Sequence, residues 1–270
     1  MTKWGICAVA CTVLFLSACG PPSSAPENAG KWKIGVPDES AGLIVDYLIH
    51  EKGANCTVVD SAISVYPIKD CCTANMEWAL SSGELDMAIM CPDAAARLIQ
   101  KDARFAILGP CMINSDIIVL APAAPKAGLR IAVSHRRHFQ RQMVYSAFGP
   151  DSRPVPMLHA GVAFAYAKGA VDGAVLDVLK GFYLNGKMIQ PGETGQDWTT
   201  YVFVVKKAFQ QTPDFKNFFA LLQDAVHELN QPGPLKQALK KYRKTELTDE
   251  MVEQWKTLNI KFVHPFDSRP

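Results

Sequence analysis

The stretch Gly83-Glu-Leu-Asp-Met-Ala-Ile-Met-Cys91 closely matches a later one, Gly169-Ala-Val-Asp-Gly-Ala-Val-Leu-Asp177. Each stretch begins with a glycine that follows a helical pattern, continues through an aspartate, and ends in a short apolar run that is typical of a buried strand. A helix, a glycine turn and a strand used twice indicate one structural unit that has been repeated. We therefore expect two similarly built lobes.

Short apolar runs alternate with helical patterns on both sides of this repeat. Strands are expected at residues 32–36, 87–90 and 105–108, and the pattern begins again with strands at 129–133 and 154–158. Strands that alternate with helices favour mostly parallel sheets with helices on their faces. The expected fold class is therefore α/β.

The first nineteen residues resemble a bacterial lipoprotein signal peptide. Lys3 is followed by an apolar run over residues 4–16 and then by Leu16-Ser-Ala-Cys19. This run is too short to span a bilayer, and a charged start, a short apolar core and small residues before a cleavage point are what an export signal needs. The resemblance implies that Cys19 becomes the first residue and carries acyl chains. Residues 20–30, rich in proline and serine, are expected to form a flexible tether.

Charge and hydropathy exclude several classes of function. Lys and Arg total 28 and Asp and Glu total 26, so the chain lacks the basic excess of a nucleic-acid-binding protein. No segment after the signal is apolar for long enough to cross a membrane. We expect a monomer that is held at the outer, extracytoplasmic face of the cell membrane by its lipid alone.

The order of these motifs is similar to that of type 2 substrate-binding proteins of ABC importers. The export signal, the strand Lys33-Ile-Gly-Val36, the unit at 79–89 and the strand Thr200-Tyr-Val-Phe-Val-Val205 carry the resemblance, which is nearest to the branch of nitrate, sulfonate and thiamin-precursor binders. It implies two lobes that close on a ligand, with residues 31–120 and 201–270 in lobe 1 and residues 121–200 in lobe 2. Strands 117–121 and 201–205 would cross between them. The partners would be a permease and an ATPase.

Ligands of open α/β sheets bind beyond the carboxyl ends of the strands. In lobe 1 this rule selects polar or sulfur side chains after four strands: Asp38, Ser40, Cys71, Cys72, Cys91, Asp93 and Cys111. In lobe 2 it selects Ser134, His135, Arg136, His159 and Asp177. Asp86 and Asp172 occupy equivalent places in the two repeated units, and we expect them to serve the local turns.

Cysteine usage suggests what these loops bind. Of eight cysteines, Cys7 and Cys11 leave with the signal and Cys19 is lipidated, so the folded body keeps Cys56, Cys71, Cys72, Cys91 and Cys111. Adjacent Cys71 and Cys72 at a helix start would have lowered thiol pKa values, and thiolates prefer soft metal ions. One hypothesis is therefore capture of a thiophilic metal or organometal by Cys71, Cys72 and Cys91, with Cys111, His159 or Asp177 completing the site. The Cys-Cys pair also resembles that of selenocysteine-assisted organometal transport proteins, here in an all-cysteine form.

Two alternatives remain open at this stage. The exported cysteines could form structural disulfides, and the ligand would then be a small organic or anionic solute such as a sulfonate, nitrate or a thiamin precursor. An enzyme similar to thiamin-pyrimidine synthases is the competing class, with Cys72 and His159 as nucleophile and base. The lipid signal and the lack of a known catalytic motif favour a binding protein, with no resident cofactor.

Overall fold

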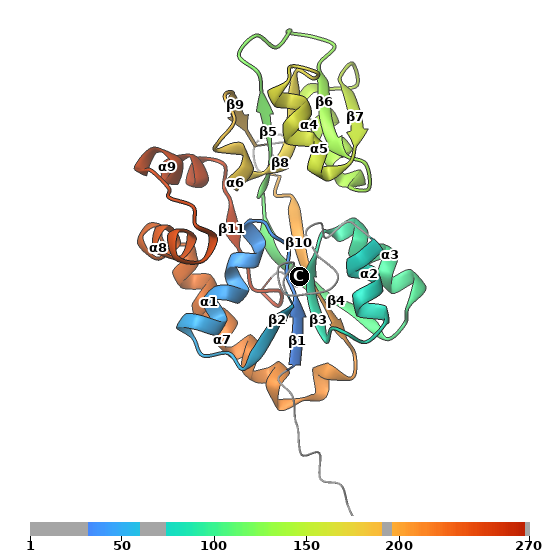
Figure 1. The fold of residues 1–270 in the computed structure, drawn as a ribbon, viewed down its shortest axis with the longest axis vertical. Helices are drawn as coiled ribbons and strands as arrows, with labels where there is room; N and C mark the ends of the chain where they lie inside the picture. Colours follow the sequence, from blue (N-terminus) through green and yellow to red (C-terminus); the bar gives the residue numbers. More distant parts are fainter. Residues whose placement is uncertain (1–31, 60–73, 191–195, 268–270) are drawn as a thin grey trace, which may run out of the picture. The chain divides into compact units, whose positions relative to one another are not determined.

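The computed structural model describes residues 32–59, 74–190 and 196–267. The expected signal, tether and lipidated Cys19 lie outside these residues, as do Cys71 and Cys72. None of the helices in the described part of the chain combines the length and the apolar character that a membrane span requires. The expected α/β fold with two lobes is confirmed, and each lobe is built around one sheet (Figure 1).

The first sheet has the strand order β11-β4-β10-β3-β1-β2. β1 is parallel to β2 and to β3, whereas β10 is antiparallel to its neighbours β3 and β4, so the sheet is mixed rather than mostly parallel. Its strands are β1 (Trp32–Gly35), β2 (Cys56–Val59), β3 (Met87–Met90), β4 (Phe105–Ile113), β10 (Thr199–Lys206) and β11 (Lys261–Phe262). In Figure 1, α1, α7 and α8 lie on one side of these strands and α2 and α3 on the other.

The helices of lobe 1 come from both ends of the body. Their bounds are η1 (Ser40–Gly42), α1 (Leu43–Glu51), α2 (Ala74–Ser81), α3 (Pro92–Lys101), η2 (Phe209–Gln211), α7 (Pro213–Leu229), α8 (Pro232–Arg243) and α9 (Asp249–Thr257). α7 begins where the Thr212 hydroxyl accepts a hydrogen bond from the backbone of Phe215, with Pro213 at its first position, an arrangement that satisfies one of the unpaired N–H groups of a helix start. Its apolar face packs Phe218 and Phe219 against Phe203 of β10.

The second sheet has the order β7-β6-β8-β5-β9. Its strands are β5 (Asp116–Leu120), β6 (Arg130–Ser134), β7 (Arg153–Met157), β8 (Gly173–Asp177) and β9 (Lys187–Ile189), and its helices are α4 (His138–Phe148), α5 (His159–Ala167) and α6 (Val178–Gly181). β6 is parallel to β7 and β8, and β5 is antiparallel to β8 and β9. β5 therefore belongs to lobe 2, although the sequence placed it at the end of lobe 1 as a crossing strand.

The repeated sequence unit forms the same local structure twice. Gly83 and Gly169 end α2 and α5 with positive φ angles of 86° and 68°, a conformation that glycine adopts without a Cβ clash. Asp86 then accepts a hydrogen bond from a backbone N–H of β1 at 2.9 Å, and Asp172 accepts one from β6 at 2.8 Å. As expected, both aspartates fix turns. They set β3 beside β1 and β8 beside β6.

The chain passes from the first sheet to the second at Asn114 and Ser115, between β4 and β5. The Asn114 side chain donates to the Asp197 carboxylate at 2.8 Å and to the Asn259 carbonyl at 2.9 Å. The side-chain oxygen of Asn114 accepts a hydrogen bond from the Trp198 backbone N–H at 2.8 Å. The return crossing, between β9 and β10, therefore lies against the outgoing one. The sequence had placed the crossings inside strands 117–121 and 201–205. The structure places those strands within single sheets.

Candidate functional site between the two lobes

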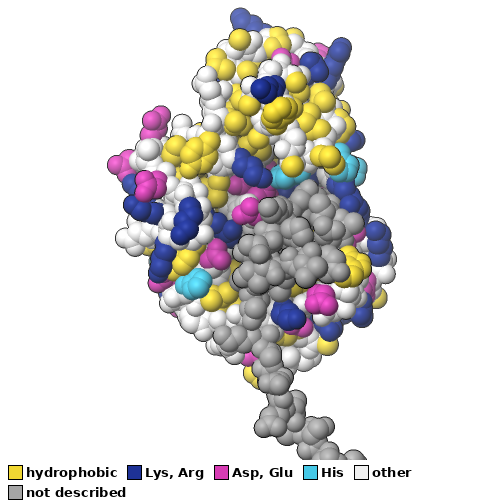
Figure 2. Space-filling view, in the orientation of Figure 1, with side chains coloured by type: hydrophobic (Ala, Val, Ile, Leu, Met, Phe, Trp, Pro, Cys, Tyr) yellow, Lys and Arg dark blue, Asp and Glu magenta, His cyan; other side chains and the backbone are white. Residues whose placement is uncertain are grey.

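A group of charged side chains joins the lobes at the carboxyl ends of their strands. Glu39 follows β1 in lobe 1, while Arg137 precedes α4, His159 begins α5 and Lys180 lies in α6, all in lobe 2. Figure 2 shows basic, acidic and histidine side chains close together in the middle of the face it presents. We call Glu39, Asp116, Arg137, His159, Asp177, Lys180 and Tyr201 the interlobe cluster.

The Glu39 carboxylate is the centre of this cluster. One oxygen contacts His159 Nε2 at 2.8 Å and Lys180 Nζ at 3.0 Å. The other accepts hydrogen bonds from Arg137 Nη2 at 3.0 Å and from the Tyr201 hydroxyl. Each oxygen therefore has two donors, which replace the water that a buried carboxylate loses.

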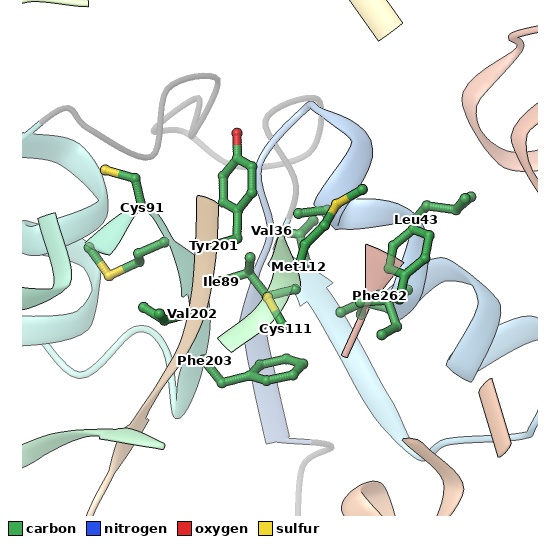
Figure 3. Close-up of a cluster of buried hydrophobic side chains, with 14 of the residues drawn as sticks. Val36, Leu43, Ile89, Cys91, Cys111, Met112, Tyr201, Val202, Phe203 and Phe262 are labelled. Carbon is green, nitrogen blue, oxygen red and sulfur yellow. The ribbon is translucent and has the colours of Figure 1, made fainter. Parts of the chain in front are cut away.

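Arg137 is held from its own lobe as well. Its Nη1 contacts both oxygens of Asp116, at 3.2 Å and 3.1 Å, and the Gln140 amide donates to the same carboxylate at 2.6 Å. The guanidinium side chain is 1% exposed and lies over the Tyr201 ring, 5.6 Å from its centroid. Figure 3 shows the Tyr201 ring on β10 with its hydroxyl pointing out of the apolar cluster. Arg137 therefore bridges a carboxylate of each lobe.

A second contact joins the lobes beside the first. The Ser40 hydroxyl donates to Asp177 Oδ2 at 2.5 Å, and the Ser40 backbone N–H donates to the same oxygen at 3.2 Å. The other Asp177 oxygen accepts from the Leu179 backbone at 3.0 Å and so caps α6. Asp177 thus combines a local role in lobe 2 with a bond to lobe 1.

His159 is fixed by contacts on both of its ring nitrogens. Nδ1 lies 2.8 Å from the Ser134 hydroxyl, while Nε2 lies 2.8 Å from Glu39 and 2.9 Å from Lys180. Burial by itself lowers the pKa of His159, but the charge and the hydrogen bond of Glu39 outweigh it and raise the pKa above its ordinary value. The Glu39 carboxylate thus favours the protonated form of the ring.

The buried acids of the cluster differ in their ionisation. Burial raises the pKa of Glu39, but the charges of Arg137, His159 and Lys180 outweigh burial and hold that pKa well below the ordinary value. Burial and the negative charge of Glu39 raise the pKa of Asp177 to about 7. Burial also raises the pKa of Asp116, against the opposing charge of Arg137. Glu39 therefore carries the firm negative charge to which the other groups respond.

Further contacts between the lobes flank the cluster. Asp93 in α3 accepts a hydrogen bond at 3.1 Å from the backbone N–H of Phe139, in the first turn of α4. Arg97 donates to the Arg136 carbonyl at 3.2 Å, and the Arg136 side chain lies 3.7 Å from Glu77. The lobes of this structure are therefore joined by paired charges and by one helix start.

The structure brings together only part of the set that the sequence selected. Ser40, Ser134, His159 and Asp177 lie in or against the interlobe cluster. Asp38 does not, because its side chain is 67% exposed and faces Arg243 at 3.8 Å. The sequence did not select the other members of the cluster, which are Glu39, Asp116, Arg137, Lys180 and Tyr201.

His135 also lies outside the cluster. It is exposed, whereas the neighbouring Ser134 is buried. One residue of rotation at the end of a strand decides which side chain faces the other lobe, and β6 is extended up to Ser134. The last four residues of β6 are all buried, so the end of this buried run at Ser134 was the signal that could have separated it from His135.

The described cysteines lie in the apolar core. Cys91 is at the end of β3, where it precedes α3, and Cys111 is in β4; both are at most 1% exposed. β10 runs between β3 and β4, so the structure does not bring Cys111 to Cys91 (Figure 3). Among the described residues no group of three or more His, Cys, Asp or Glu side chains is arranged to hold a metal ion. Because Cys71 and Cys72 are outside those residues, the expected thiol site stays a prediction.

Comparison with solved structures shows what this fold is similar to. The ligand-binding component of an ABC-type import system from Staphylococcus aureus, with zinc bound, is 12% identical with a TM-score of 0.63, covering 87% of this chain and 85% of that one. The alkanesulfonate-binding protein SsuA from Xanthomonas axonopodis pv. citri, bound to MOPS, is 16% identical with a TM-score of 0.59, covering 85% and 83%.

A putative methionine-binding lipoprotein from Bacillus subtilis is 12% identical with a TM-score of 0.55, covering 79% of this chain and 95% of that one. These neighbours are binding proteins rather than enzymes. At such identities the likeness establishes the fold, which is that of two-lobed periplasmic binding proteins. No family model and no curated protein matches the sequence.

Proposed function

We propose that this protein is the extracytoplasmic solute-binding component of an ABC importer and binds its solute where the two lobes meet, at the interlobe cluster. The observation that carries the proposal is the interlobe cluster itself. Glu39, His159 and Asp177 lie at or just after the carboxyl ends of β1, β7 and β8, which is where α/β sheets bind ligands. A solute placed there contacts both lobes at once.

The mechanism of such a protein is closure of the lobes. Contacts between Glu39 and lobe 2 can form only when the lobes are together, and the same holds for the bond between Ser40 and Asp177. A solute that touches both lobes stabilises the closed state because its contacts are lost on opening. The permease and ATPase would then receive the closed complex. Because no chemical step is required, the solute is released unchanged.

A screen for the solute tests this proposal. We expect one class of small molecule to raise the unfolding temperature and to reduce the radius of gyration in small-angle X-ray scattering, since a ligand at 100 times its Kd stabilises the folded state by about 2.7 kcal/mol. His159→Ala should weaken that response, and His227→Ala, at an exposed position on α7, should leave it unchanged. Conversion of the recovered solute into a product would overturn the proposal in favour of an enzyme.

The membrane attachment is a separate part of the proposal. The sequence Leu16-Ser-Ala-Cys19 supports cleavage before Cys19 and acylation of this residue, including palmitate. Two acyl chains on one residue suffice for stable anchoring. In labelling with radioactive palmitate, the wild-type chain should incorporate the label and Cys19→Ser should not. Equal labelling of the two would overturn the assignment.

The second candidate for the ligand is a thiophilic metal or organometal held by Cys71, Cys72 and Cys91. It is favoured by the position of Cys91, which ends β3 beside β1, the strand that leads to Glu39. Native mass spectrometry of protein purified without oxygen should show a bound metal that Cys71→Ser/Cys72→Ser removes and Cys56→Ser, at the start of β2, does not. Protein without metal and with paired thiols would leave the small-solute candidate.

A further inference from the structure

Three of the four donors to the Glu39 carboxylate come from lobe 2. Arg137, His159 and Lys180 belong to the starts of α4 and α5 and to α6, so the donors surround the carboxylate from separate elements. The Glu39 side chain is 2% exposed in this arrangement. A carboxylate of lobe 1 thus fills a site that lobe 2 forms.

The donors are positioned by contacts that do not involve Glu39. Asp116 and Gln140 hold the guanidinium of Arg137 in place within lobe 2. Ser134 lies 2.8 Å from His159 Nδ1, which aims the opposite nitrogen, Nε2, at the carboxylate. Preorganised donors lose little entropy when an anion arrives. Lobe 2 therefore holds Arg137 and His159 in place by contacts that do not depend on Glu39.

The chemistry of these donors defines what else they can bind. A guanidinium, an ammonium and an imidazolium that converge on two oxygens suit a carboxylate or a sulfonate group, and Arg binds both planar and tetrahedral oxyanions with more than one N–H. In lobe 2 itself the acids next to these donors, Asp116 and Asp177, both have pKa values raised by burial. With the lobes together, these raised pKa values reduce the negative charge that Asp116 and Asp177 set against the three donors.

We propose that Arg137, His159 and Lys180 form a receptor for one oxyanion group of the solute, a carboxylate or a sulfonate, and that Glu39 occupies this receptor as an intramolecular competitor when no solute is bound. The inference rests on the proposed function and names the chemical class of its ligand. Glu39 is tethered, so its effective concentration at the receptor is on the order of millimolar. A solute anion binds only by displacing it, and the apparent affinity of the protein is lowered accordingly.

The test measures binding of simple oxyanions to the full chain by isothermal titration calorimetry. Acetate and methanesulfonate are the probes, and ethylammonium is the cation control. Glu39→Gln removes the negative charge of the competitor while keeping its size, so we expect it to bind both anions at least tenfold more tightly than wild type. Ethylammonium should show no gain. Glu246→Gln makes the same change at an exposed glutamate, 74% exposed and paired with Lys240, and should bind as wild type does.

Two further variants keep the test decisive. Glu39→Asp retains the charge but shortens the reach by one methylene, and it should give a smaller gain than Glu39→Gln. Adding Arg137→Met to Glu39→Gln should abolish the gain because it removes the donor that lies deepest. Equal anion affinities in wild type, Glu39→Gln and Glu39→Asp would overturn the inference, and so would a gain that survives the loss of Arg137.

Failure of the inference and failure of the proposed function give different results. If no variant gains anion affinity while a solute from the screen still closes the lobes, the oxyanion receptor is refuted and the solute-binding function stands. If Glu39→Gln gains anion affinity but no solute closes the lobes, the receptor stands and the importer function is refuted.

Discussion

Replacing Arg137 by methionine should destabilise this protein more than any change at a surface charge. The side chain is 1% exposed and touches carboxylates of both lobes, Glu39 at 3.0 Å and Asp116 at 3.1 Å. Methionine has a similar length and no charge, so the variant leaves buried acids without their cation. Removing one partner of a buried ion pair costs about 3–5 kcal/mol. We expect a loss near the lower end, since Gln140 still donates to Asp116 at 2.6 Å.

The expected loss of stability can be divided between the two acids that Arg137 contacts, Asp116 and Glu39. Asp116 lies in the same lobe as Arg137, and burial already raises its pKa, so it can take up a proton when the guanidinium is gone. Glu39 belongs to the other lobe and keeps Lys180 and His159. Most of the loss should therefore fall within lobe 2. Asp116→Asn combined with Arg137→Met should recover part of it, with a coupling energy of about 0.5–3 kcal/mol.

The assay is urea unfolding at neutral pH, followed by circular dichroism. Arg136→Met is the matched control, because that neighbouring side chain is 31% exposed and its distance from Glu77 is 3.7 Å, for which about 0.2–1 kcal/mol is expected. A free energy of unfolding for Arg137→Met within about 1 kcal/mol of wild type, the size expected for a surface pair, would refute the assigned role of Arg137. Equal losses of stability in the two variants would refute it as well.

Three other substitutions test the ionisation of Asp177, the crossing between the sheets at Asn114 and the packing of Phe203. Burial and Glu39 raise the pKa of Asp177 to about 7. Stability from a raised pKa is complete below the unfolded pKa of about 3.9 and is lost as the pH rises through the folded pKa. Wild type should therefore lose more stability than Asp177→Asn between about pH 4 and 7 in urea unfolding, and equal losses would contradict this. Asn114→Ala should lower the free energy of unfolding by about 2–4 kcal/mol, because it removes side-chain hydrogen bonds and places alanine at a φ of 60°. Asn114→Gly loses the same bonds but tolerates that φ, so it should lose less stability in the same assay, and the reverse order would refute this explanation. Phe203→Ala should cost about 3–5 kcal/mol because it leaves a cavity beside Phe218 on α7, and a loss below about 1 kcal/mol would exclude tight packing there.

The repeated sequence unit predicted the fold well because its information is local. Gly83 and Gly169 have the positive φ angles that end a helix, and Asp86 and Asp172 fix the following turns by bonds to the neighbouring strand. Helix ends and the turns that follow them depend on nearby residues, so the pattern of one stretch is enough. The place where the chain changes sheets depends on pairing between distant strands. The sequence assigned that change to β5, which instead pairs with β8.

The site was harder to predict than the fold because turn geometry decides which side chain faces inward. Asp38 and Glu39 are adjacent acids, and only the second is buried, because the turn after β1 directs one side chain to solvent and the next to lobe 2. From the sequence alone, these two adjacent acidic residues cannot be distinguished. Lys180 was missed for a related reason. A lysine on a short helix that pairs with a buried acid has the same sequence pattern as a lysine that faces solvent, until its partner is known.

Two ionisations in the interlobe cluster act in the same direction. His159 has a pKa raised by Glu39 against the effect of burial, so raising the pH above that value removes a positive charge that faces Glu39. Asp177 ionises near pH 7 and adds a negative charge that Glu39 also faces. Arg137 and Lys180 remain charged throughout, so they attract Glu39 at every pH in this range. The attraction of lobe 2 for Glu39 is therefore strongest in mild acid and weakens as the pH rises, so we expect Glu39 to be a weaker competitor for the donors of lobe 2 in base.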